Sequence, residues 1–99
     1  MLLRRVDDQY RWEAPRTPEP PSVSARRMWY DTVGHGHVAA LRCAIDSFGA
    51  DRLLLGTDFP YENGDVFLRA VEYIDDPQID TSAARAILDR NASALLRIG

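Results

Sequence analysis

The segment that most constrains the fold is Leu53-Leu54-Leu55-Gly56-Thr57-Asp58-Phe59-Pro60. A short apolar run stops at a glycine, and a single acid follows just before an aromatic residue and a proline. This pattern predicts a buried strand that presents the Asp58 carboxylate at its C-terminal end, where α/β folds collect reacting groups. We expect the Phe59-Pro60 pair to stiffen the loop and to hold that carboxylate in a water-poor mouth.

The flanking sequence predicts alternating strands and helices. Residues 28–33 are aromatic and β-branched enough for a buried strand, and 38–48 have a helical apolar pattern that ends at Gly49, a residue typical of helix C-caps. A helix capped by Asp65 is expected after the strand at 53–55, with Phe67, Ala70, Val71 and Ile74 on its inner face. This order is the repeating unit of an α/β fold with parallel strands.

The two ends of the chain add further helices. Residues 1–13 are read as the tail of a helix, and 14–21 contain four prolines that indicate a stiff loop, followed by one helical turn capped by Ser22. Near the other end, Asp80 is expected to cap a helix, and 91–98 to form a short terminal helix. In the capped helix the inward residues are Ala84, Ile87 and Leu88. We therefore divide the chain into 1–27, a helix tail and Pro-rich loop, and 28–99, an α/β part.

Length and charge limit the classes of protein that fit. The chain has 99 residues, far fewer than the about 250 of a complete eight-stranded α/β barrel. A net charge of -3 gives no attraction for nucleic acid or an anionic membrane, and we read Arg4-Arg5 and Arg26-Arg27 as solvated helix faces. No apolar run suits a membrane span and the start does not resemble a secretory signal, so a cytoplasmic location is expected.

Cys43 is the single cysteine of the chain. It excludes an internal disulfide and a cysteine-based zinc knot. Because it lies within a helical apolar pattern, we expect a buried and inert thiol.

Several polar residues are candidates for chemistry, each with a structural alternative. Asp58 can bind a divalent cation or exchange a proton with substrate, or it can accept hydrogen bonds from loop amides. His35 and His37 can share a metal or, alternatively, His35 contacts a ligand while His37 caps the next helix. Asp31 is either a buried acid that needs a partner, such as an arginine, or an outward-facing one, and we favour the second. Beyond Asp58, Glu62 and Asn63 line a pocket or form a polar turn, and three aromatic residues are read as core: Trp29, Tyr30 and Phe67.

Several of these segments together resemble one family. The shared features are Tyr30-Asp31-Thr32, the phrase GADRLLLGTDFPYE at 49–62 and the phrase ILDRNASALLRI at 87–98. This pattern resembles the C-terminal end of the amidohydrolase-related metal-dependent hydrolases. Within them it is similar to the branch of the aminocarboxymuconate semialdehyde and resorcylate-type decarboxylases.

The resemblance implies a (β/α)₈ barrel in which this chain supplies the last two βα units and the terminal helices. It implies a hydrolase or decarboxylase (carboxy-lyase) that acts on a small carboxylic acid, with a divalent metal, zinc in most members. Asp58 matches the acid that binds the metal and takes part in proton transfer, and His35 is a candidate for substrate binding. The family's first-strand and mid-barrel histidines have no counterpart in this sequence, so we expect the chain alone to lack a complete site.

An alternative from another class is a non-catalytic association module or the remnant of a truncated gene. Two strands cannot cover each other's edges, so the chain is expected to form a homo-oligomer or to need a missing N-terminal segment. No nucleic-acid or membrane partner is expected.

Overall fold

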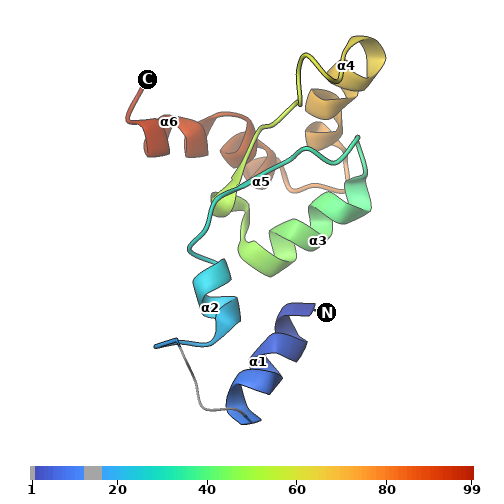
Figure 1. Ribbon diagram of the computed structural model, residues 1–99. Helices are drawn as coiled ribbons and strands as arrows, with labels where there is room; N and C mark the ends of the chain where they lie inside the picture. Colours follow the sequence, from blue (N-terminus) through green and yellow to red (C-terminus); the bar gives the residue numbers. More distant parts are fainter. Residues whose placement is uncertain (1, 13–16) are drawn as a thin grey trace.

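The computed structural model describes residues 2–12 and 17–99 (Figure 1). Two short parallel strands lie in the middle of the molecule, β1 (Tyr30–Asp31) and β2 (Leu53–Leu54), with Tyr30 opposite Leu53 and Asp31 opposite Leu54. Helix α3 (Val38–Phe48) connects the strands, and α4 (Gly64–Glu72) follows β2. The predicted strand–helix–strand–helix order with parallel strands is therefore confirmed.

The remaining helical segments lie toward the two ends of the chain and between these elements. Figure 1 shows α1 (Leu2–Trp12) and α2 (Pro21–Ala25) together at one end of the molecule, where the Ser22 backbone N–H donates to Asp7 Oδ1 at 2.9 Å. The other segments are η1 (Ala50–Arg52) before β2, η2 (Tyr73–Asp75) after α4, and a run formed by α5 (Thr81–Arg85), the π-helical η3 (Ala86–Arg90) and α6 (Asn91–Leu96).

Several predicted helix ends are confirmed by the structure. α3 ends at Gly49, which has a φ of 92° that a side chain would strain. Its N-cap is His37, whose Nδ1 accepts from the Ala40 backbone N–H at 3.2 Å. The N-cap of α5 is Asp80, whose Oδ2 accepts from the Ala83 N–H at 3.2 Å. Local capping chemistry thus sets these boundaries.

Other local predictions were wrong. Each strand is only two residues long, because the chain on either side of the ladder turns toward loops or helices. The N-cap of α2 is Pro20 rather than Ser22. α4 starts after the extended residue Asn63, which leaves Asp65 in the first turn, where a carboxylate still favours the helix dipole. The predicted elements at residues 1 and 13–16 lie outside the described residues.

Cys43 was also wrongly predicted, because the structure places it at an exposed position of α3. The buried position of that helix is Leu41, with Val38, Ala44 and Ile45 half-buried beside the core. At 100° per residue, Cys43 falls on the side opposite Leu41. Its Sγ lies 3.9 Å from Ser47 Oγ, one turn along the helix.

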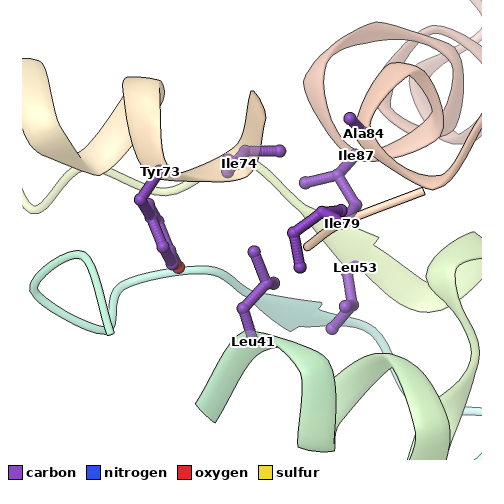
Figure 2. Close-up of a cluster of buried hydrophobic side chains, with 7 residues drawn as sticks. All are labelled: Leu41, Leu53, Tyr73, Ile74, Ile79, Ala84 and Ile87. Carbon is purple, nitrogen blue, oxygen red and sulfur yellow. The ribbon is translucent and has the colours of Figure 1, made fainter. Parts of the chain in front are cut away.

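The core is one cluster of buried side chains drawn from both halves of the α/β part. Figure 2 shows side chains from α3, β2 and the segments after α4 pointing toward one another. Its members are Leu41, Leu53, Tyr73, Ile74, Ile79, Ala84 and Ile87. The prediction that Ala84, Ile87 and Ile74 face inward is confirmed, and Leu88 packs half-buried against the cluster. This core fixes β2 between α3 and the C-terminal helical run.

Two buried polar side chains hold the strands at opposite ends. Thr32, which follows β1, donates its N–H to the Leu54 carbonyl at 3.0 Å and accepts from the Gly56 N–H through Oγ1 at 3.2 Å. The Tyr73 hydroxyl donates to the Thr32 carbonyl. At the start of β2, Asn91 Nδ2 donates to the carbonyls of Ala50 at 2.7 Å and Leu53 at 2.8 Å.

Within residues 2–12 and 17–99, no helix combines the length and the apolar character that a membrane crossing requires.

The packing of the core predicts that shortening the buried Ile87 side chain strongly lowers the stability of the fold. Ile87 is fully buried at 0% exposure, so Ile87→Ala should lower the free energy of unfolding by about 2–5 kcal/mol through lost burial and the cavity left behind. Leu96→Ala is the control, because Leu96 is 63% exposed and its loss should cost less than about 0.5 kcal/mol. Urea denaturation measures both, and equal effects would contradict this description of the core.

The buried Tyr73 hydroxyl predicts that the stability of the fold decreases at alkaline pH. Burial raises the pKa of Tyr73 above its ordinary value of 10.0, so the folded state holds this proton more tightly than the unfolded chain. Its contribution to stability is therefore fully present below pH 10 and is lost as the pH rises further. The chain has no lysine, so deprotonation of lysine does not add to this alkaline loss of stability.

Unfolding followed from pH 8 to pH 11.5 tests this prediction. Tyr73→Phe should lose about 1 kcal/mol at neutral pH and should show a smaller alkaline loss than the parent chain. Tyr61→Phe is the control, because Tyr61 is 86% exposed and its removal should leave the alkaline loss intact. An unchanged alkaline profile in Tyr73→Phe would rule out this role.

Candidate functional site

The site lies where the two loops leave the C-terminal ends of the parallel strands. The loop at 32–37 follows β1 and the loop at 55–63 follows β2, and Figure 1 shows both leaving the sheet in the same direction. They approach closely at Gly56, where an added Cβ would lie 2.8 Å from Val33 Cγ2 and 2.9 Å from Asp31 Cβ. Only a glycine fits between these neighbours, so the start of the second loop is held against the end of β1.

Asp58 is in this second loop, as predicted. Its backbone is in the left-handed region, with a φ of 59°, and its carbonyl accepts from the Glu62 N–H at 3.0 Å to close a turn. The side chain is exposed, and within the part of the chain that the structure describes its carboxylate has no hydrogen-bond or ion-pair partner. The alternative in which this carboxylate accepts from loop amides is therefore not observed.

His35 and Glu62 connect the two loops. His35 Nδ1 lies 3.5 Å from Glu62 Oε1, a distance for an electrostatic contact rather than a short hydrogen bond. The His35 side chain is 65% exposed and that of Glu62 is 29% exposed. The structure thus brings His35 to the same edge of the sheet as Asp58. It also gives Glu62, for which the sequence left a pocket role and a turn role open, a definite partner.

The remaining polar candidates have local roles. His37 uses its Nδ1 to cap α3, so the alternative reading of this residue as a cap is confirmed. Asp31 is exposed, as expected, and its Oδ1 accepts from the Val33 N–H at 3.0 Å. Asn63 occupies the N-cap position of α4 without a side-chain hydrogen bond.

The aromatic residues near the site are more exposed than predicted. Phe59 is 67% exposed and makes an edge contact with Phe67 at 5.6 Å between ring centroids, so the expected water-poor mouth around Asp58 is not what the structure shows. Tyr30 stacks on Phe48 at 4.2 Å beside the core. Trp29 is half-buried, with the Arg52 guanidinium 5.0 Å from its ring centroid. These contacts make the aromatic residues borders of the core rather than its centre.

The described residues do not provide a metal site by themselves. Among them, no group of three or more His, Cys, Asp or Glu side chains is placed to hold a metal ion. A zinc site needs about three protein ligands, and Asp58 offers one carboxylate. The two histidines do not serve as a pair, because His37 is occupied at the start of α3.

A pocket of about 180 Å³ lies beside the site, between β1 and α3. It is bordered by Thr32, Gly34, His37, Leu41 and Tyr73 among others, and it does not include Asp58. Its walls combine core side chains such as Leu41 and Tyr73 with exposed residues such as His37, and neither Asp58 nor His35 borders it.

Sequence reasoning missed Thr32 and the partnership of Glu62 with His35. A polar threonine inside the strand predicted at 28–33 was the available signal for the first, since its hydroxyl can accept a hydrogen bond beside the ladder. The second joins residues far apart in sequence across two loops, and no local pattern encodes such a contact.

Comparisons with known proteins agree on one family. The family model described as amidohydrolase matches residues 5–98. The chain is also similar to the crystal structure of 2,6-dihydroxybenzoate decarboxylase from Rhizobium, with 26% sequence identity and a TM-score of 0.80 over 97% of this chain. It spans 30% of the length of that decarboxylase chain. No curated protein matches. The chain therefore belongs to the amidohydrolase family, and its two strand–helix units form part of that family's (β/α)₈ barrel fold.

Proposed function

We propose that this chain supplies Asp58 and its neighbouring loops to the active site of an amidohydrolase-type decarboxylase that acts on a small carboxylic acid. Family membership supports a hydrolase or decarboxylase type of function. The likeness to 2,6-dihydroxybenzoate decarboxylase favours loss of CO₂ over hydrolysis. Because the chain spans 30% of that enzyme, further strands would have to complete the site.

The state of Asp58 is the observation that carries this proposal. A carboxylate that stabilises a loop normally accepts hydrogen bonds from nearby backbone N–H groups. Asp58 has no such partner among the described residues, yet its backbone has a left-handed φ of 59°, which costs free energy in a non-glycine residue. Residues held in such strained backbone conformations cluster at functional sites.

Decarboxylation assigns a clear task to such a group. The bond between the substrate carbon and its carboxylate breaks, CO₂ leaves, and the electron pair remaining on carbon takes up a proton. In our proposal Asp58 relays that proton: its carboxylate takes the proton from solvent or from the acid group of the substrate and passes it to the carbon as CO₂ leaves. His35, at the same edge of the sheet, contacts the substrate through its exposed imidazole.

The family is generally metal-dependent, and the proposal includes a divalent metal, zinc by resemblance. Asp58 is the residue of this chain that would bind it. The described residues do not complete the ligand set, so the remaining ligands would have to come from outside them.

This view predicts weak metal binding by the isolated chain. Titration of the 99-residue protein with ZnCl₂ in a calorimeter should give no stoichiometric binding at micromolar protein, because one carboxylate cannot replace three ligands. Tight binding of one zinc ion per chain, lost in Asp58→Asn, would contradict the proposed incomplete ligand set.

A second prediction concerns turnover. In any active form, either the chain itself or a longer polypeptide that contains it, Asp58→Asn should lower kcat for CO₂ release from 2,6-dihydroxybenzoate by about 100-fold or more. Asp46→Asn is the matched control: this exposed aspartate is near the C-terminal end of α3, which leads back to the start of β2, opposite the site. Full activity in Asp58→Asn would remove Asp58 from the mechanism.

A further inference from the structure

Glu62 makes contact with both loops of the candidate site. Its backbone N–H donates to the Asp58 carbonyl at 3.0 Å and closes the turn that presents Asp58. Its side-chain Oε1 lies 3.5 Å from His35 Nδ1 in the other loop. One residue therefore connects the segment that follows β2 with the segment that follows β1.

The two residues that Glu62 contacts share an unusual backbone conformation. Among the described residues, three non-glycine residues have a positive φ: His35 at 50°, Asp58 at 59° and Arg97 at 55°. Arg97 is the C-cap of α6, where a left-handed residue is common. The other two lie in the loops of the site, and strain of this kind persists only where surrounding contacts enforce it.

We propose that Glu62 is a positioning residue that fastens the Asp58 turn to the His35 loop and so fixes where the Asp58 carboxylate points. This inference rests on the proposed function. The carboxylate of Glu62 is mostly shielded while the imidazole of His35 is mostly exposed, at 29% and 65% exposure. Glu62 is thus the inner member of the pair, and His35 keeps an open face toward a ligand.

The alternative is that Glu62 only forms a polar turn before α4. In that case its side chain would be dispensable, since the backbone N–H alone closes the turn at Asp58. A change at His35 distinguishes the two roles. If Glu62 only forms a turn, replacing His35 should leave the conformation at Asp58 unchanged. If Glu62 holds the two loops together, replacing His35 should also alter the conformation at Asp58.

Amide NMR spectra of the 99-residue chain test the connection directly. His35→Ala should move the amide signals of the turn at 58–61 (Asp58, Phe59 and Tyr61, since Pro60 has no N–H), although His35 is distant in sequence. Glu62→Ala should move the signals of both 34–37 and this turn. Glu62→Gln retains an acceptor oxygen for a neutral imidazole and should restore part of the parent spectrum. Glu72→Ala, an exposed glutamate at the end of α4, is the control and should move neither set.

Kinetics of an active form test the consequence. Glu62→Ala should lower kcat by about 10- to 100-fold with little change in KM, because misplacing a reacting group affects the chemical step. Glu62→Gln should recover part of the loss, and Glu72→Ala should retain the parent rate.

The outcomes separate the two proposals. If His35→Ala leaves the signals of 58–61 unmoved, or if Glu62→Ala keeps full kcat while Asp58→Asn abolishes it, the positioning role is wrong and the proposed function stands. If Asp58→Asn keeps full turnover, the proposed function fails first, whatever the result at Glu62.

Discussion

The hydrogen bonds of Thr32 are the interaction on which the arrangement of the site depends. A two-residue strand pair has few ladder bonds of its own, and Thr32 extends the pairing through its N–H to Leu54 and its Oγ1 to Gly56. Its carbonyl receives the Tyr73 hydroxyl from the segment after α4. One buried residue thus joins both strand ends and the following helical layer, which directs both loops away from the same edge of the sheet.

The hydrogen bonds of Thr32 also determine where the residues of the candidate site lie. Gly56 lies against β1 because no Cβ fits there. Two residues later Asp58 is held in a strained turn, and its carboxylate has no partner among residues 2–12 and 17–99. His35 reaches the same region from the other loop and meets Glu62. Membership of the amidohydrolase family supplies a context in which a strand-end acid has a chemical task. Asp58 itself is exposed, and the described residues place no cluster of ligand side chains around it.

The sequence was sufficient where local chemistry decides the structure. The bounds of α3, the cap at Asp80, the inward residues of α5 and η3 and the position of Asp58 at the end of β2 all follow from capping residues, apolar spacing or a glycine stop. The family could also be inferred, because two specific phrases occur in the right order.

The sequence was insufficient where a contact between distant segments decides the structure. The strands proved shorter than their apolar runs, since hydrogen-bond partners rather than composition set strand length. Cys43 is exposed because the core covers a narrower stripe of α3 than the apolar pattern suggests. Glu62 and His35 meet across two loops, and the sequence offered only their polarity.

Asn91 has a consequence for how such a site can diversify. Its side-chain amide donates hydrogen bonds to the carbonyls of Ala50 and Leu53 at the start of β2. Thr32 accepts from the Gly56 N–H just after the end of the same strand. Both ends of β2 are therefore anchored by residues that lie outside the loop that follows the strand. Exposed loop positions that carry neither Asp58 nor Glu62, such as Tyr61 and Asn63, can change without shifting the strand beneath them. Surface loops on rigid supports are where new binding specificities arise. The hydrogen bonds of Asn91 and Thr32 give the loop that contains Asp58 such a rigid support.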